Sequence, residues 1–266
     1  MSTIDIELLT DSTIDGQGVR EITVDGDVVW TSELEAVIPS GAELRWRAGS
    51  GSGDVVDVIG GRNGSNNGIE WRSGFGPDGN YLHSGGSGYV SNGTSSFTAG
   101  GSYLSCMCWL RIDERNDSYQ DRIFGHMDSG DSGGYFNNSW YFRSRLIEDS
   151  DGNMRQRLGY VMHSNSYDSA FAWDGSDFDV EEWHHFAGVA NIGSWVKMYV
   201  DGVEVDHNDW EGGSTYENGD ELKFSANSSR GRSYEGDASD FILGNNRFSP
   251  SEIEDYYEST KHRYGH

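Results

Sequence analysis

The sequence predicts an all-β protein, a sandwich or barrel of antiparallel strands, and three observations support this fold class. Apolar runs are short and are separated by clusters of Gly, Asn, Asp and Ser, which is typical of strands joined by turns. Glycine is abundant, with 37 residues, whereas proline occurs only 3 times. A convincing helix pattern occurs once, near the C-terminus. The length of 266 residues suits one large all-β domain, alone or with a small appendage.

The first 39 residues stand apart from the rest. The stretch REITVDGDVVW predicts a β-hairpin, because Asp25-Gly26 supplies the two positive-φ residues of a type I′ turn. Pro39 marks a boundary, so we expect a small β segment over 1–39 and a main domain over 40–266. A hairpin with one further strand is too small to be stable alone. The segment is therefore expected either to anchor or oligomerise the protein, or to add a pair of strands to the main domain.

The main domain shows a steady succession of strand patterns, each a short run bounded by turn residues. The predicted strands cover residues 43–48, 88–91, 102–112, 121–127, 139–147, 156–163, 169–173, 183–191, 194–200, 203–207, 221–226 and 240–244. One helix follows them in the stretch SPSEIEDYYES. Ser249 is its N-cap, Pro250 its first helical residue and Glu252 its third, and this arrangement predicts a capping box.

The stretch WVKMYVDGVEVDH predicts a second hairpin, with a two-residue loop at Asp201-Gly202. The register that this loop sets places one row of residues on the core face: Val196, Met198, Val200, Val203 and Val205. The opposite face carries Trp195, Lys197 and Tyr199 across from Glu204 and Asp206. Lys197 is expected to pair with Asp206.

The preceding strand contains two adjacent histidines, His184 and His185, in the stretch EEWHHFAGVA. Neighbours on a strand point to opposite faces, so these two side chains cannot share a metal ion. We expect the pair to be structural, with a buried histidine satisfied by a backbone carbonyl.

The composition is strongly acidic, with 44 Asp and Glu against 19 Lys and Arg and a formal net charge of −25. Only three of the basic residues are lysines: Lys197, Lys223 and Lys261. Such a surface repels itself in dilute buffer, and salt screens the repulsion. The composition therefore indicates a halophilic protein, for which nucleic acid and anionic membranes are poor partners.

The two cysteines, Cys106 and Cys108, lie two apart in a strand pattern. They face the same side and are poorly placed to bond each other, so we expect buried free thiols. The N-terminal stretch MSTIDIELLTDSTID has neither a basic region nor a long apolar run. We therefore expect no signal peptide or membrane insertion, and synthesis in the cytoplasm.

The stretch WHHFAGVANIGSWVKMYVDGVEV resembles the signature hairpin of laminin-G-like domains in the concanavalin A-like lectin/glucanase superfamily. Further segments resemble that family in the same order, including SSFTAGGSYLSCMCWLRID and the closing GDASDFILGNNRFSPSEIEDYY. The resemblance covers roughly residues 42–258 and does not reach the first 39. It implies a jelly-roll sandwich of two antiparallel sheets, one concave and one convex.

The hydrolases of this superfamily carry paired glutamates on one strand, in a Glu-x-Asp-x-x-Glu or similar arrangement that aims them at one cleft. The nearest match in this sequence is EIEDYYE, from Glu252 to Glu258, which falls in the predicted helix. No strand is expected to carry such a set, and no phosphate-binding loop, His-Glu-x-x-His or Cys-x-x-Cys motif occurs. We therefore expect no catalytic residues, although carboxylates assembled from separate strands remain an alternative.

The resemblance also implies a calcium ion, because laminin-G-like domains commonly hold one with an Asp, an Asn and loop carbonyls. Asp57, Asn63 and Asp240 are the ligands that it implies in this chain, and hard oxygens of this kind suit calcium. The sequence departs from the family pattern at Val58-Ile59 and Arg62, where the family has small residues. The alternative is that these are ordinary turn residues.

Three long Gly/Asn/Asp-rich segments carry aromatic residues that could stack on sugar rings. The candidate glycan-binding residues are Tyr135, Trp140, Trp173 and Trp210. The alternative for each residue is a place in the core at the edge of a sheet.

Together these features indicate a non-enzymatic virion surface protein of a haloarchaeal virus, such as a decoration, turret or tail-fibre component. Its lectin-like domain is expected to bind a host-surface glycan or an S-layer protein. The segment 1–39 is expected to contact other virion proteins or to form a homo-oligomer. Two alternatives remain: a purely structural scaffold, and a polysaccharide hydrolase or lyase.

Overall fold

The structure is a computed structural model, and it divides the chain into two compact units, Met1–Val37 and Ile38–His266. It describes residues 21–24, 27–31, 36–49, 51–92, 102–112, 121–127, 140–148, 154–163, 169–173, 181–210, 221–225 and 234–266. In the first unit, β1 (Glu21–Val24) pairs antiparallel with β2 (Asp27–Thr31). Val24 faces Asp27, so the strands pair where the sequence predicted a hairpin, and the turn residues Asp25 and Gly26 lie outside the described residues. The anchoring role of this unit stays a prediction.

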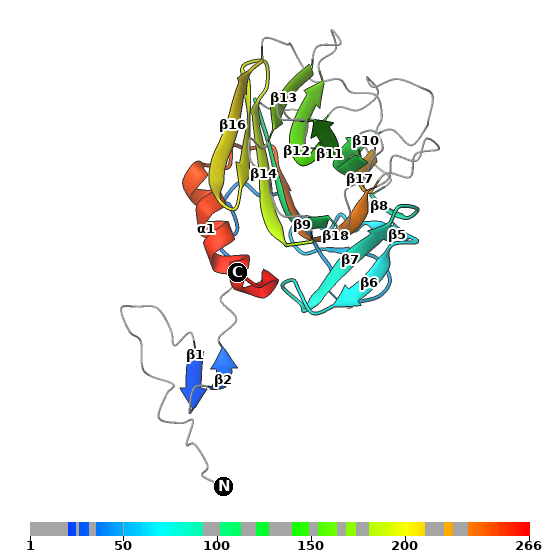
Figure 1. The fold of residues 1–266 in the computed structure, drawn as a ribbon, viewed down its shortest axis with the longest axis vertical. Coiled ribbons are helices and arrows are strands. Elements are labelled where there is room, and N and C mark those ends of the chain that lie inside the picture. The colour runs from blue at the N-terminus through cyan, green and yellow to red at the C-terminus, as the bar shows by residue number, and fades with distance from the viewer. Residues whose placement is uncertain are drawn as a thin grey trace. The chain divides into compact units, whose positions relative to one another are not determined.

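The larger unit is a sandwich of two antiparallel sheets, which confirms the predicted fold class (Figure 1). Within the described residues, the first sheet has seven strands. In spatial order they are β13 (Ser169–Trp173), β12 (Met154–His163), β11 (Trp140–Glu148), β10 (Asp121–Met127), β17 (Glu221–Phe224), β8 (Tyr89–Ser91) and β5 (Ser65–Asn67).

In the part of the chain that the structure describes, the second sheet has nine strands, and seven of them are hydrogen-bonded in one continuous order. In spatial order these are β16 (Val203–Asp209), β15 (Trp195–Val200), β14 (His184–Asn191), β9 (Tyr103–Ile112), β18 (Glu235–Gly244), β3 (Leu44–Arg47) and β4 (Val56–Asp57). The other two, β7 (Asn80–Gly85) and β6 (Glu70–Ser73), join through the first half of β18. The strands β4, β5, β6 and β7 lie outside the predicted strand ranges, and the first three are short and carry mostly polar residues.

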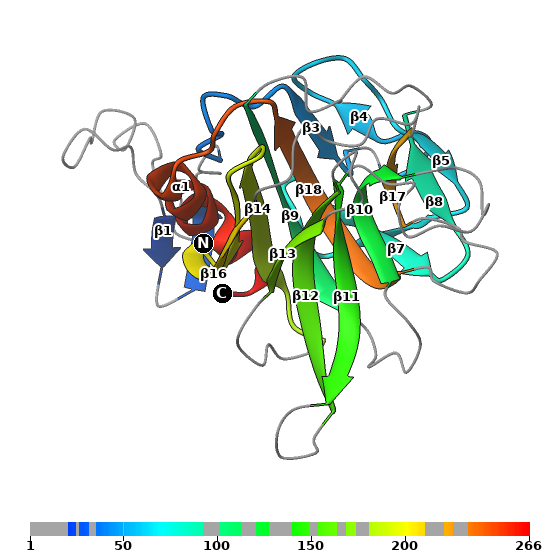
Figure 2. The ribbon, with the colours of Figure 1, turned by 90° about the horizontal axis from the view of Figure 1, so that it is seen from above.

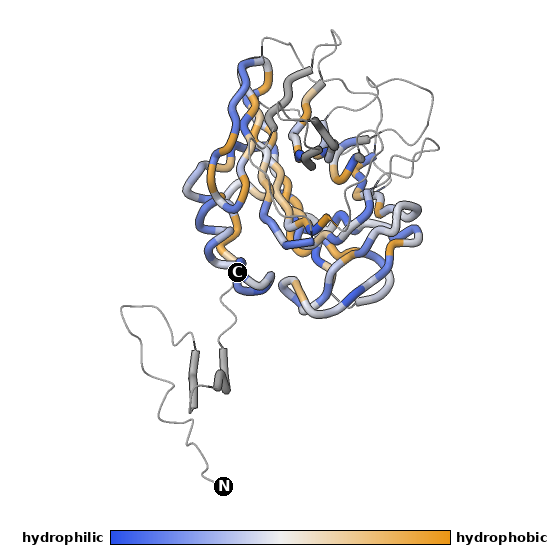
Figure 3. The backbone as a smooth tube through the Cα atoms, viewed as in Figure 1, coloured by the Kyte–Doolittle hydropathy of each residue, from blue (hydrophilic) through white to orange (hydrophobic). Residues whose placement is uncertain are grey.

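The core lies between the two sheets, whose strands face each other in Figure 2. Strand β9 shows the alternation most clearly: Cys106, Cys108 and Leu110 belong to the core, and both cysteines are free and buried as predicted. Trp109 points to the opposite side of the nine-stranded sheet, which we call its outer face. Figure 3 shows hydrophobic residues concentrated along the strands that enclose the core.

The helix α1 (Pro250–Thr260) and the short 3₁₀ helix η2 (Lys261–Tyr264) pack on this outer face. The ring of Tyr257 stacks on Trp109 with a centroid distance of 5.8 Å, and Tyr264 stacks on it at 4.1 Å. The predicted capping box is present, with Ser249 as N-cap and Glu252 as its partner.

Glu252 also ties the helix to the chain that leads into β3, because its carboxylate accepts hydrogen bonds from the amide and hydroxyl of Ser40 at 3.0 and 2.8 Å. Burial by itself would raise the pKa of Glu252. The hydrogen bonds from Ser249 and Ser40 outweigh that effect and lower the pKa to about 2.

The hairpin of β15 and β16 begins in the predicted register and then departs from it. Val200 pairs with Val203 and Tyr199 with Glu204, but Met198 pairs with Asp206, because a bulge leaves Val205 without a partner. Val203 is 66% exposed and was wrongly assigned to the core. Lys197 binds Glu204 rather than Asp206, at 2.8 Å.

We expect Gly188→Ala to destabilise the sandwich by about 1–3 kcal/mol, the usual cost of overpacking a core. A Cβ at Gly188 in β14 would lie 2.5 Å from the ring of Tyr160, which belongs to the opposite sheet. Urea unfolding measures the loss. Gly85→Ala is the control and should change stability by less than about 0.5 kcal/mol, since the nearest atom to its Cβ is 4.0 Å away. Equal stability of the two variants would contradict this packing.

We expect Glu252→Ala to lower stability at neutral pH by about 1 kcal/mol, the usual scale for a lost helix cap. The carboxylate has a lowered pKa, so its contribution is complete above the unfolded value of about 4.3. It is lost as the pH falls toward about 2. Thermal unfolding between neutral and acidic pH should therefore show a gap between variant and wild type that closes in acid. Glu254→Ala, an exposed position on the same helix, should show no such gap.

Candidate functional site

The two adjacent histidines have structural roles, as predicted, but the proposed carbonyl partner is wrong. The imidazole of His185 is fully buried among rings of the outer face, 5.5 Å from Trp109 and 5.1 Å from Tyr256 between centroids. Within the described residues neither of its ring nitrogens has a hydrogen-bond partner. Burial lowers the pKa of His185 to about 4, so the ring is neutral at pH 7.

His184 takes part in a bond network centred on Asp201, at the turn between β15 and β16. The carboxylate of Asp201 contacts Nδ1 of His184 at 2.8 Å and accepts the backbone N–H of His185 at 2.8 Å. The backbone N–H of Asp201 donates in turn to the carbonyl of His185. Burial opposes ionisation of Asp201, but these bonds outweigh it and lower its pKa. The His-His and Asp-Gly motifs therefore fasten one hairpin turn to the neighbouring strand.

The three residues implied as calcium ligands do not fit a calcium ion. Both carboxylate oxygens of Asp57 accept backbone N–H groups: Oδ1 from Arg45, Ile59 and Gly60, and Oδ2 from Arg62 at 2.8 Å. Oδ1 of Asn63 accepts the N–H of Asp57 at 3.0 Å. These two residues therefore shape the turn after β4, which was the alternative reading of the sequence.

Asp240, the third implied ligand, already holds a cation of the protein itself. Its two oxygens bind Nε and Nη2 of Arg45 at 2.6 Å each, and Oδ2 also accepts from the hydroxyl of Tyr256 at 2.6 Å. A guanidinium in this position repels a second cation. In the described part of the chain, no cluster of three or more His, Cys, Asp or Glu side chains could hold a metal ion.

The four aromatic residues predicted to bind glycan do not form one surface. Trp140 in β11 is 0% exposed and Trp210, after β16, is 3% exposed, and both belong to the core. A ring without accessible surface cannot stack on a sugar, so the prediction is wrong for these two, and the alternative of sheet-edge core applies. Trp173 lies in β13, but its side chain is outside the described residues, as is the whole of Tyr135.

One strand does carry carboxylates at a spacing close to the hydrolase pattern, contrary to the sequence-based expectation. In β18 they are Glu235, Asp237 and Asp240, which follow a Glu-x-Asp-x-x-Asp order. The aspartates at the second and third positions are each held in an ion pair with arginine, by Arg111 and Arg45 respectively. Their carboxylate oxygens are therefore engaged by side chains of the protein itself.

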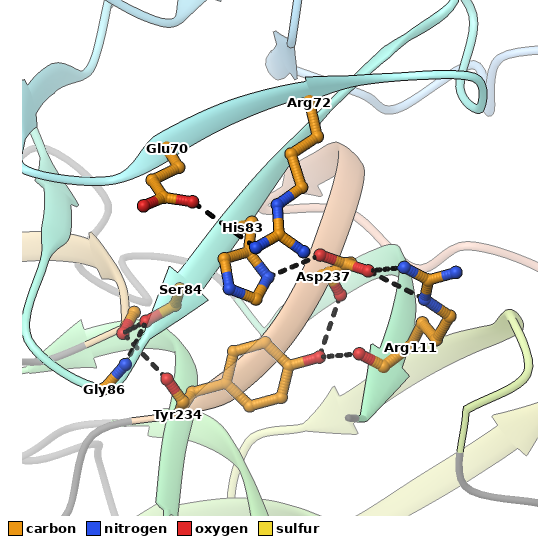
Figure 4. Close-up of polar contacts among 9 residues, drawn as sticks. Glu70, Arg72, His83, Ser84, Gly86, Arg111, Tyr234 and Asp237 are labelled. Atoms are coloured by element: carbon orange, nitrogen blue, oxygen red, sulfur yellow. Dashed lines mark hydrogen bonds and ion pairs between the residues drawn. The ribbon is translucent and has the colours of Figure 1, made fainter. Parts of the chain in front are cut away.

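Asp237 is the centre of a polar cluster on the outer face, shown in Figure 4. It is 0% exposed and lies between His83 of β7, whose Nδ1 is 2.8 Å away, and Arg111 of β9, whose Nε donates at 2.7 Å. The hydroxyl of Tyr234 donates to the backbone carbonyls of Asp237 and Arg111, at 2.8 and 2.9 Å.

Aromatic rings surround the cation of this cluster. The guanidinium of Arg111 lies 5.7 Å from the centroids of Phe75 and Tyr81 and 5.6 Å from that of Trp183, within the range of cation–π attraction. An Asp–His pair could orient a general base, but the adjacent Ser84 points into the core and bonds Ser225 at 2.7 Å. The cluster therefore links β7, β9 and β18, and Ser84 is not placed beside the Asp–His pair.

A second group of ring and cationic side chains lies on the outer face, on β15 and β16 and near the start of β9 and the end of β18. We call it the Trp195 surface and define it by Tyr103, Trp195, Lys197, His207 and Arg247. The ring of Trp195 is 6.3 Å from Tyr103 and 6.0 Å from His207 between centroids. Nζ of Lys197 and Cζ of Arg247 each lie 5.5 Å from it. The predicted hairpin had placed Trp195 and Lys197 on this face, but no signal in the sequence brings Tyr103 and Arg247 to them.

None of the described helices is long and apolar enough to cross a membrane.

A model of the Laminin_G_3 family, described as the concanavalin A-like lectin/glucanases superfamily, matches residues 84–254. The sequence has no match among the curated proteins.

Several solved structures share the fold. The receptor binding domain of botulinum neurotoxin C/D mosaic serotype has a TM-score of 0.61 and 13% identity, over 82% of this chain and 51% of that one. The binding domain of Paraclostridial Mosquitocidal Protein 1 has a TM-score of 0.64 and 14% identity, over 82% and 52%. The chain thus spans about half the length of these two domains. Domain 4 of AbnA, a GH43 extracellular arabinanase from Geobacillus stearothermophilus solved in complex with arabinotriose, has a TM-score of 0.56 and 15% identity, over 82% and 99%.

We expect Asp237→Asn to destabilise the protein by about 3 kcal/mol, the usual scale for removing one partner of a buried ion pair. The substitution keeps the size of the side chain and leaves Arg111 without its carboxylate. Denaturant unfolding in molar salt measures the loss. Glu70→Gln is the control: its 3.4 Å ion pair with Arg72 is exposed, so the change should be below about 0.5 kcal/mol. Similar losses in both variants would show that the cluster does not stabilise the sheet.

Proposed function

Because the chain belongs to the concanavalin A-like lectin/glucanases superfamily, we propose that it is a carbohydrate-binding module without catalytic activity. The observation that carries the proposal is the family match over residues 84–254, together with the lectin-like sandwich. Two of the similar structures are named as binding domains of toxins, and a third is a domain of an arabinanase in complex with arabinotriose. Those names describe other proteins, and they favour a binding role here.

The state of the carboxylates supports a role without catalysis. Glu252, at the start of the Glu-rich stretch considered in the sequence, caps α1 and binds Ser40. The aspartates of β18 are neutralised by Arg45 and Arg111. A glycosidase needs one carboxyl group that protonates the leaving group and a second that acts as nucleophile or base, and both must be free to contact the substrate.

The composition supports a more specific setting. A net charge of −25 with three lysines suits a protein that works in molar salt. We place it on the surface of a haloarchaeal virion, as a decoration, turret or tail-fibre component made in the host cytoplasm. The first unit, with its small hairpin, would contact other virion proteins or form a homo-oligomer, and the sandwich would bind a host-surface glycan or S-layer protein.

We expect the full chain, in molar salt, to bind intact haloarchaeal cells and to bind less to cells stripped of surface glycan. The physical reason is that sugar hydroxyls and ring faces are the groups that a lectin-like surface recognises. Labelled protein and cell sedimentation measure the binding, with heat-unfolded protein as the control. Binding to neither kind of cell would favour the scaffold alternative, and release of reducing ends from a polysaccharide would favour the hydrolase alternative.

A further inference from the structure

The Trp195 surface lies on a part of the outer face that α1 leaves uncovered. The helix packs over Trp109 and His185, and η2 continues toward Trp183, whose ring lies 5.1 Å from that of Tyr264 between centroids. At the opposite ends of the strands, Tyr103 and Trp195 are partly exposed, Arg247 is exposed, and the side chain of His207 is 45% exposed.

Strand register places the rings in a row. Asn191 of β14 pairs with Tyr103 of β9 on one side and with Trp195 of β15 on the other, and Lys197 pairs with His207 of β16. The three rings therefore follow one another across four adjacent strands, with successive centroids 6.3 and 6.0 Å apart, so the row spans about 12 Å at most. A row of this length can contact more than one sugar ring of a linear glycan. Rings on regular strands are also held rigidly, which lowers the entropy lost on binding.

The charges in this surface are not all balanced within the protein. Nζ of Lys197 binds both carboxylate oxygens of Glu204, at 2.9 and 2.8 Å. Arg247 follows β18 and, among the described residues, has no carboxylate in an ion pair with it. Such an arginine is unexpected in this chain, because 44 acidic residues outnumber 19 basic ones. An exposed guanidinium with open donors, beside an aromatic ring, favours a planar anionic group such as a carboxylate.

We infer that the Trp195 surface binds an acidic sugar of a linear glycan. The sugar rings pack against the exposed parts of Tyr103 and Trp195, and a uronic acid carboxylate pairs with Arg247. His207 lies at the end of the row, 3.7 Å from Asp209, and offers a further polar contact. The inference rests on the proposed carbohydrate-binding function and adds to it a site and a class of ligand.

The test is calorimetric binding of the full chain to a panel of oligosaccharides with and without carboxylates. The panel contains oligogalacturonate, hyaluronate and alginate oligomers, each with its carboxyl-reduced counterpart, in dilute and in molar salt. Wild type should bind at least one acidic oligomer more tightly than its reduced form. Trp195→Ala and Arg247→Gln should each weaken that binding about tenfold or more, as expected for a lost aromatic contact and a lost charge-assisted hydrogen bond.

The matched control is Arg72→Gln, which removes an exposed arginine from the other end of the same face. It should bind as wild type does. Arg247→Gln alters only an exposed side chain, so it remains informative even where Trp195→Ala reduces stability. In the Arg247→Gln variant, the preference for acidic over carboxyl-reduced oligomers should disappear, while binding to the reduced oligomers should be unchanged.

The outcomes separate this inference from the proposed function. Cell binding that depends on surface glycan but survives both substitutions would overturn the Trp195 surface and leave the lectin role intact. Equal binding of acidic and reduced oligomers by wild type would overturn the acidic ligand. Failure of wild type to bind either the panel or the cells would overturn both proposals.

Discussion

The arrangement of the nine-stranded sheet depends on the ion pair between Asp240 and Arg45. Asp240 sits at an irregularity of β18, with a positive φ of 53°, where the strand exchanges β7 for β3 as its neighbour. From this point its carboxylate binds Arg45 of β3 and Tyr256 of α1. One side chain thus joins the strand, its new partner and the helix that covers them. Because both charges are buried, neither can lose its partner without a large cost.

This pairing also explains why an expected metal site is replaced by a protein contact. The family resemblance directs attention to Asp57, Asn63 and Asp240 as oxygen donors. In the fold, Asp57 and Asn63 accept hydrogen bonds from backbone N–H groups around the turn after β4, and Asp240 forms an ion pair with the guanidinium of Arg45. The chain supplies its own cation, so the residue types match a calcium site while their partners do not.

The outer face of this sheet is divided into three parts with different consequences for function. The middle is closed by α1 and η2, whose tyrosines stack on Trp109. At one end, the carboxylate of Asp237 binds the side chains of Arg111 and His83, so these polar groups are paired with one another. The remaining end exposes Trp195 and Tyr103 beside Arg247. Binding is therefore expected where the protein has not already paired its own rings and charges.

The local elements could be predicted from short stretches of sequence. The alternation around Cys106 and Cys108, the two-residue turn at Asp201-Gly202 and the capping box at Ser249 each depend on residues within a few positions of one another. Short-range sterics and side-chain periodicity are enough to predict such elements. The same reasoning placed His184 and His185 on opposite faces.

Only the tertiary structure decided which side chains remain available to a ligand. Trp140 and Trp195 look alike in sequence, each beside a turn-rich segment at the start of a strand, yet the first is buried between the sheets and the second lies on the outer face. The bulge that exposes Val203, and the convergence of Tyr103 with Arg247, likewise depend on pairing between distant strands. Exposure is set by what another layer covers, and no local pattern contains that information.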